Sequence, residues 1–207
     1  IPLCLVGSEM CIRDSFDTLP DGAETNTGIY VNNENTGTDP LSADTDGDGI
    51  EDDDEILCRL FSDYGRFCSH PLDSDSDNDG INDGDEFNIG TNPIDHDSDN
   101  DGLTDGLELG VTGNIFEKEY NYNSCTIKVG SSPLANCYET WQPDEDNLST
   151  TNPNEADSDG AGINDGDEDL NKNGKLDEGE TAANLFDTDG GGRGDSEEIL
   201  EDLSLIH

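Results

Sequence analysis

The chain has 207 residues, and its composition differs sharply from that of an ordinary globular domain. Hydrophobic residues make up 29 %, against about 45–50 % in typical domains, and 52 acidic residues against 8 basic ones give a formal net charge of −44. Such a chain repels itself and is expected to stay disordered unless cations neutralise it. The charge argues against nucleic acid as a partner, and no apolar run is long enough to cross a bilayer, so we expect no membrane insertion.

The two ends of the sequence read as translations of one DNA element. Residues 10–15 can be back-translated to a strand whose reverse complement encodes Leu-Ser-Leu-Ile-His, which is the sequence of residues 203–207. This inverted pair resembles the adapter of a transposase-based sequencing library. We therefore expect residues 1–15 and 203–207 to be adapter sequence attached to a metagenomic fragment.

Residues 16–35 contain a truncated repeat and a linker. The string DTLPDGAE at 17–24 corresponds to positions 5–12 of a twelve-residue window that recurs downstream. The adapter-like sequence replaces the first half of that window, so we expect no competent site in this segment.

Complete windows follow the pattern D-x-D-x-D-G-[IL]-x-D-x-x-E. Three windows match every defined position, and three degenerate windows keep glycine at position 6, aspartate at 9 and glutamate at 12. The six windows are 44–55, 75–86, 97–108, 157–168, 169–180 and 187–198.

This spacing matches the ligand requirements of calcium. Calcium takes about six to eight hard oxygen ligands, which side chains at positions 1, 3, 5, 9 and 12 and the carbonyl of position 7 can supply around a turn at glycine 6. Magnesium keeps more of its waters, and zinc prefers Cys and His clusters, so calcium is favoured. We expect about four to six bound calcium ions, because windows 157–168 and 187–198 lack an acid at position 5 and window 169–180 carries less charge.

The predicted metal ligands are Asp44, Asp46, Asp48, Ile50, Asp52, Glu55, Asp75, Asp77, Asp79, Ile81, Asp83, Glu86, Asp97, Asp99, Asp101, Leu103, Asp105, Glu108, Asp157, Asp159, Ile163, Asp165, Glu168, Asp169, Asn171, Asn173, Lys175, Asp177, Glu180, Asp187, Asp189, Asp195 and Glu198.

The segments around the windows argue against an ordinary EF-hand. A proline precedes four of the windows, which disfavours an incoming helix. A short helix can follow each loop, with the position-9 aspartate as its N-cap and, after window 75–86, Gly90 as its C-cap. Window 169–180, with Leu176 at position 8, is the most similar to an EF-hand or dockerin loop.

The unit DSDNDGINDGDEFNIGTNPIDHD at 75–97 resembles the bacterial thrombospondin type 3 repeat, and the resemblance covers most of 36–108 and 150–198. It implies an irregular, calcium-stabilised repeat array with short helical turns and little regular secondary structure. It also implies an extracellular or cell-surface location, as a spacer in an adhesin, surface protein or secreted enzyme.

Two insertions interrupt the repeats, and each contains two cysteines. Residues 36–108 hold repeats with a Cys-pair insertion at 56–70, residues 109–152 form an aromatic insertion, and residues 153–202 hold the degenerate repeats. Local pairing of Cys58 with Cys68 and of Cys125 with Cys137 fits this layout and an exported protein, whereas free thiols would fit a cytosolic one.

The insertion at 109–152 is predicted to form a small disulfide-tied β-hairpin. Its aromatic side chains would form either a local core or a patch that binds a glycan or a surface protein. They are Phe116, Tyr120, Tyr122, Tyr138 and Trp141.

No catalytic motif is evident, and the windows account for the acids that a glycosidase would need, so we expect no enzyme activity. The sequence favours a calcium-rigidified spacer of a secreted or cell-surface bacterial protein. The alternatives are a glycan- or protein-binding module that uses residues 109–152, and a calcium-dependent linker of a secreted hydrolase.

Overall fold

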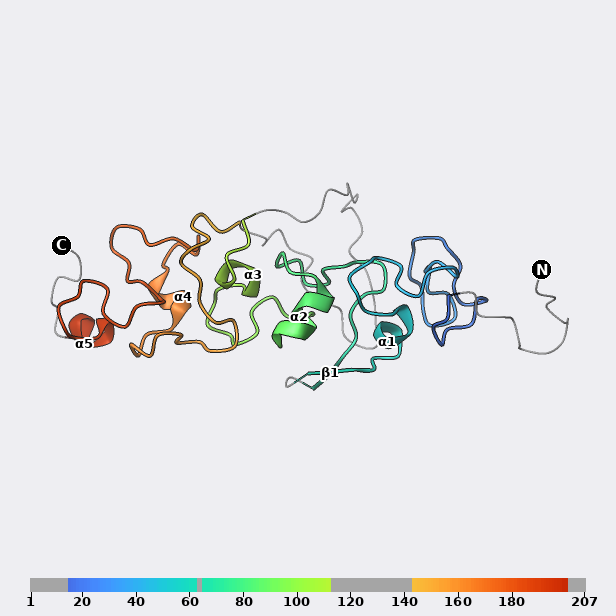
Figure 1. The fold of residues 1–207 in the computed structure, drawn as a ribbon, viewed down its shortest axis with the longest axis horizontal. Helices are drawn as coiled ribbons and strands as arrows, with labels where there is room; N and C mark the ends of the chain where they lie inside the picture. Colours follow the sequence, from blue (N-terminus) through green and yellow to red (C-terminus); the bar gives the residue numbers. More distant parts are fainter. Residues whose placement is uncertain (1–14, 63–64, 113–142, 201–207) are drawn as a thin grey trace, which may run out of the picture. The chain divides into compact units, whose positions relative to one another are not determined.

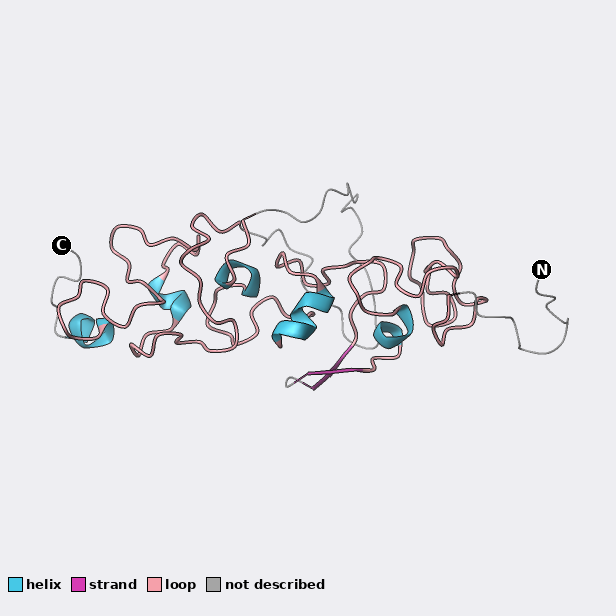
Figure 2. Cartoon of the chain, viewed as in Figure 1, coloured by secondary structure: helices cyan, strands magenta, loops and turns pink. Residues whose placement is uncertain are grey.

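A computed structural model of the chain describes residues 15–62, 65–112 and 143–200 (Figure 1). Short helices, two short strands and long connecting loops make up these residues (Figure 2). The helices are α1 Asp52–Ile56, α2 Asp83–Ile89, α3 Asp105–Glu108, α4 Asp165–Glu168 and α5 Asp195–Leu200. Strands β1 Leu60–Ser62 and β2 Gly65–Phe67 pair antiparallel, with Leu60 opposite Phe67. This irregular array is the fold class that the sequence predicts.

The chain forms two compact units. Among the described residues, the first unit contains 15–77 and 82–94, and the second contains 78–81, 95–112 and 143–200. The predicted hairpin and the Cys125–Cys137 pair of the aromatic insertion lie outside the described residues, as do both adapter-like ends apart from Ser15.

Each helix begins at position 9 of a window, one residue earlier than an N-cap at that position would give. The N-cap residue is instead position 8, for example Asn82, whose extended backbone (φ −76°, ψ 147°) precedes the helical Asp83. Helix α2 ends at Gly90 in the left-handed conformation (φ +94°), which confirms the predicted C-cap.

The turn inside each window needs left-handed backbone at two places. Gly102, at position 6, has φ +105°, a conformation in which glycine is strongly favoured. Asn100, at position 4, has φ +64°, and the other windows have Asn, Gly or Lys at this position, also with positive φ. Asn and Gly recur at position 4 because they adopt a positive φ more readily than other residues do. The twelve-residue pattern assigned no residue type to this position.

Carboxylates, rather than apolar side chains, fill most of the interior. The complete windows each bury the apolar side chain at position 7: Ile50, Ile81 and Leu103 are 4–6 % exposed, and window 97–108 also buries Leu107. The largest fully buried side chains include Glu55, Glu86 and several aspartates, and this identifies the centre of each repeat as a charged cluster. A core of this kind cannot be stabilised by apolar burial alone.

Successive windows pack directly on one another through position 10. A Cβ added to Gly106 or Gly166 would lie far inside van der Waals contact with the carbonyl oxygen at position 5 of the preceding window, Asp79 or Asp101. Gly84 has the same relation to Asp48 in the first unit. Glycine at position 10 thus allows a close approach of two backbones that a side chain would block.

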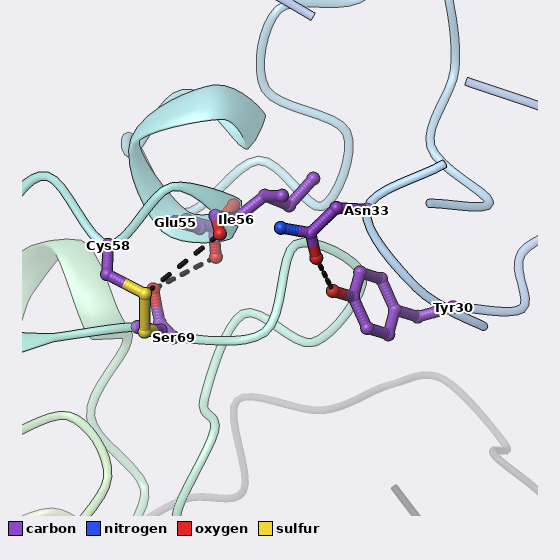
Figure 3. Close-up of a disulfide and its surroundings, with 7 residues drawn as sticks. Tyr30, Asn33, Glu55, Ile56, Cys58 and Ser69 are labelled. Atoms are coloured by element: carbon purple, nitrogen blue, oxygen red, sulfur yellow. Dashed lines mark hydrogen bonds between the residues drawn. A yellow bond between two sulfur atoms is a disulfide. The ribbon is translucent and has the colours of Figure 1, made fainter. Parts of the chain in front are cut away.

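The Cys58–Cys68 disulfide, predicted from the local pairing of cysteines, closes the hairpin insertion of the first unit. Figure 3 shows it beside Ser69, whose hydroxyl donates to Glu55 Oε1 at 3.0 Å. The insertion therefore brings a hydroxyl group to the last acid of window 44–55.

The long insertion leaves the repeat packing intact. The N–H of Asp144 donates to the carbonyl oxygen of Val111 at 3.0 Å, so the two ends of the segment 112–143 meet. Gly166 N–H donates to Asp101 Oδ2 at 2.8 Å, which joins window 157–168 directly to window 97–108.

Candidate metal centres

The first half of window 44–55 gathers three carboxylates around one turn. Oxygens from Asp44, Asp46 and Asp48 all lie within 4.8 Å of one another, a spacing that a single cation can bridge. The backbone ties the turn, because the N–H groups of Gly47 and Gly49 donate to the two oxygens of Asp44 at 2.6 and 3.1 Å. The structure therefore brings together the ligands predicted at positions 1, 3 and 5.

The hydrogen bond that ties the turn between positions 6 and 1 recurs in four other windows. In each, the N–H of the glycine at position 6 donates to the carboxylate at position 1. The pairs are Gly102–Asp97 at 3.0 Å, Gly162–Asp157 at 3.0 Å, Gly174–Asp169 at 2.7 Å and Gly192–Asp187 at 2.6 Å. The loop geometry is thus preserved in the degenerate windows.

A hydroxyl residue at position 2 holds the aspartate at position 9. Ser98 donates to both oxygens of Asp105, from N–H at 2.8 Å and from Oγ at 2.6 Å. Thr45 binds Asp52 in the same way, at 2.8 and 2.7 Å. Related contacts join Ser76 to Asp83, Ser158 to Asp165 and Thr188 to Asp195. These contacts fix the orientation of aspartates that are fully buried.

The position-9 aspartate also faces the preceding window. Oxygens of Asp83, Asp48 and Glu55 lie within 4.8 Å of one another. Asp83 is at position 9 of window 75–86, whereas Asp48 and Glu55 are at positions 5 and 12 of the preceding window, 44–55. In the second unit, burial raises the pKa of Asp105 to about 7, and the charges of Asp79 in the preceding window and Asp97 in its own window contribute to this rise. The windows therefore share carboxylates, whereas the sequence pattern assigned each aspartate to its own loop.

The glutamate at position 12 is buried with one oxygen held by a linker hydroxyl. Glu55 is 0 % exposed and Glu108 is 2 % exposed. The hydroxyl groups of Ser69 and Thr151 donate to their Oε1 atoms, each at 3.0 Å. The Oε2 atoms of both glutamates are buried and have no hydrogen-bond partner among the described residues. A buried, unpaired carboxylate oxygen is costly and indicates a ligand.

Burial and crowding make these glutamates prefer the protonated form when no cation is bound. Loss of hydration, together with the charges of Asp46 and Asp48, raises the pKa of Glu55 to about 11. The same causes, with Asp99 and Asp101 as neighbours, raise the pKa of Glu108 to about 9. At neutral pH each cluster therefore needs either protons or a cation, and a dense set of carboxylate oxygens fits calcium.

Windows 157–168 and 187–198 keep part of this arrangement. Ala161 replaces the position-5 acid of the first and is itself buried, while Asp157 Oδ1 and Asp159 Oδ2 are buried without hydrogen-bond partners among the described residues. Gly191 replaces the acid of the second, and its N–H donates to Asp187 and Asp189. Each window therefore offers fewer acidic ligands, as the sequence predicted.

Window 169–180 differs because side chains of the same window donate hydrogen bonds to its position-9 aspartate, Asp177. Asn171 and Asn173 donate from Nδ2 to Asp177 Oδ2 at 2.9 and 3.1 Å, and Lys175 Nζ lies 3.3 Å from Asp177 Oδ1. These contacts lower the pKa of Asp177. Leu170 stands where the other windows have Ser or Thr at position 2, so this window lacks the hydroxyl that orients position 9 elsewhere.

The remaining predicted ligands are divided between the two units. Asp75, Asp77 and Glu86 lie in the first unit and Asp79 in the second, and Glu86 accepts a hydrogen bond from the Thr91 hydroxyl at 3.2 Å. Calcium coordination by the position-7 carbonyl groups stays a prediction. The hydroxyls at position 2 and in the linkers were missed, although Ser or Thr recurs at position 2 of five windows.

None of the helices in the described part of the chain is both long enough and apolar enough to cross a membrane. Neither the curated proteins nor the solved structures gave a match to the chain. The family model of the bacterial TSP3 repeat matches residues 44–58, 75–96 and 97–109. These three segments are bacterial TSP3 repeats, a class of calcium-binding repeat.

Proposed function

We propose that the chain is a calcium-rigidified extracellular spacer in a secreted or cell-surface, adhesin-like bacterial protein. The repeats would order on calcium binding and hold neighbouring domains apart, without catalytic activity of their own. One observation carries the proposal: carboxylates fill the interior of the repeats, so the folded state depends on a cation for its stability.

The direct packing between windows supports a mechanical role. In three windows the glycine at position 10 lies against position 5 of the preceding window, as Gly106 does where its N–H donates to Asp79 Oδ2 at 2.9 Å. A cation bound beside such a contact would restrain two windows at once. A spacer needs this kind of coupling between neighbours, because independent loops would leave flexible joints.

The test is single-molecule energy transfer between dyes placed near residues 16 and 200 of the full chain. Calcium is expected to narrow the distance distribution greatly, and a chelator is expected to broaden it again. A distribution equally broad with and without calcium would refute the spacer role even if calcium binds. Binding of a glycan or a surface protein through residues 109–152 stays a prediction.

A further inference from the structure

Residues 17–24 fold like the second half of a complete window. Phe16, at position 4, has the positive φ (+74°) that the other windows show there. Leu19 N–H donates to Asp17 Oδ1 at 2.8 Å, as Ile50 N–H does to Asp48 Oδ1 at 2.7 Å. Leu19 is 4 % exposed, which matches the buried apolar residue at position 7 of the complete windows. We call residues 17–24 the half-window.

The half-window meets Asp52 of the next window in a buried carboxylate cluster. Oxygens of Asp17, Glu24 and Asp52 lie within 4.8 Å of one another, and the residues are 2 %, 3 % and 0 % exposed. Asp17 and Glu24 occupy positions 5 and 12 of the half-window, and Asp52 occupies position 9 of the following window, 44–55. This is the arrangement of Asp48, Glu55 and Asp83 one repeat later.

Glu24 points to a ligand independently of the cluster. Both of its carboxylate oxygens are buried, and neither has a hydrogen-bond partner among the described residues. In Glu55 a linker hydroxyl holds one oxygen. The hydroxyls of the linker after the half-window are engaged elsewhere: Thr36 and Thr38 bond to each other at 2.7 Å, and Thr36 Oγ1 is 3.1 Å from the Ala23 carbonyl oxygen. Glu24 therefore presents two oxygens, as a bidentate ligand would.

We propose that Asp17, Glu24 and Asp52 form a further divalent-cation site, for which calcium is the chemical match. Arg13 and Ser15 precede the half-window at positions 1 and 3, so the single-window pattern predicts no site there. The following window supplies the missing acid through Asp52, whose orientation Thr45 fixes at 2.8 and 2.7 Å. This site rests on the calcium binding of the repeats and extends it to a segment outside the matched ones.

The test is a calorimetric calcium titration of the full chain and of the Glu24→Gln variant. The variant is expected to bind one calcium ion fewer than the parent chain. Glu34→Gln is the matched control, since Glu34 is an exposed acid in the adjoining linker and the charge change is the same. An unchanged stoichiometry in Glu24→Gln would overturn this site alone, whereas a parent chain that binds no calcium would overturn the proposed function as well.

Hydrogen exchange locates the effect and reports whether the variant folds. In the parent chain, calcium at about one hundred times its Kd is expected to slow exchange of the amides of residues 18–25 by roughly 100-fold. Glu24→Gln should lose this protection and keep the protection of window 97–108. Calcium protection of window 97–108 without protection of residues 18–25 in the parent chain would refute the site.

Discussion

Individual buried carboxylates have opposite effects on the folded state with and without a cation. Metal-free, Glu108 is buried beside Asp99 and Asp101, and its pKa rises from 4.5 to about 9. The folded form thus binds this proton more tightly than the unfolded form does. If calcium takes the place of the proton, as we propose, the same negative charges serve as ligands, and the burial that destabilises the empty cluster favours the loaded one.

This opposition predicts a reversal in pH dependence. In a chelator, the stability that Glu108 contributes is complete below about pH 4.5 and is lost as the pH rises to about 9, because its pKa is raised on folding. Calcium affinity should instead increase over the same range. Circular dichroism from pH 4 to 9, with chelator and with calcium, measures the folded fraction and tests this.

The Glu108→Gln variant should flatten the chelator curve, and Glu178→Gln, a change at an exposed acid, should not. A metal-free folded fraction that rises with pH in the parent chain would contradict the account.

Contact between backbones gives a second prediction at this scale. Gly106→Ala should destabilise the calcium-loaded chain by about 1–3 kcal/mol, because its Cβ would overlap the carbonyl oxygen of Asp79. Gly22→Ala is the matched control: Gly22 is at position 10 of the half-window, and nothing lies within 4 Å of the added Cβ. Denaturant unfolding in calcium measures both, and equal stabilities of the two variants would rule out the close packing.

The single-window pattern predicts candidate ligand residues but not how they combine. Positions 1, 3 and 5 are close in sequence, so their convergence in window 44–55 follows from the local turn. Asp83 joins Asp48 and Glu55 only through packing between windows, which no local pattern contains. The recurring glycine at position 10 was a visible signal of that packing, but its cause is steric and becomes evident only from the carbonyl beneath it.

At the scale of elements, the hairpin insertion and window 44–55 act together. The Cys58–Cys68 disulfide spans a sequence separation of 10 and places Ser69 against Glu55 (Figure 3). The disulfide itself was predicted from cysteine spacing. The link to a candidate calcium ligand was not, since it depends on where the hairpin returns to the window.

Replacing both Cys58 and Cys68 with alanine should weaken calcium binding at window 44–55, because Ser69 would no longer be held against Glu55. The loss of the constraint is worth about 2–4 kcal/mol in typical proteins. Hydrogen exchange in calcium should show faster opening of residues 44–55 and unchanged protection of window 97–108. Ser69→Ala, which keeps the disulfide, should reproduce a smaller part of the effect; equal protection in all three proteins would contradict the coupling.

At the scale of the whole molecule, repeats contact one another across insertions of very different length. Window 97–108 contacts window 157–168 through Asp101 and Gly166, although 48 residues separate the two windows. The sequence predicted this insertion as a separate segment but could not show that the repeats resume contact beyond it. The hydrogen bond between Asp144 N–H and the Val111 carbonyl, which brings the ends of the insertion together, explains how they do.

Residues 113–142 should therefore be dispensable for the calcium-bound repeats. Replacing them with a short Gly-Ser turn is expected to leave calcium stoichiometry unchanged and to shift the melting temperature by only a few degrees, since loop-closure entropy depends weakly on length. Loss of calcium protection in window 157–168 of the shortened chain would show that the insertion contributes to the fold.

The central claim is that calcium binding and folding are one event, because the repeats have carboxylates where other domains have apolar cores. The most direct measurement is a calorimetric calcium titration of the full chain with its disulfides intact, repeated in excess magnesium and followed in parallel by circular dichroism. The account predicts saturable binding of several calcium ions, a simultaneous gain of structure and little competition by magnesium. An absence of saturable binding, or ordered repeats in chelator at neutral pH, would contradict it.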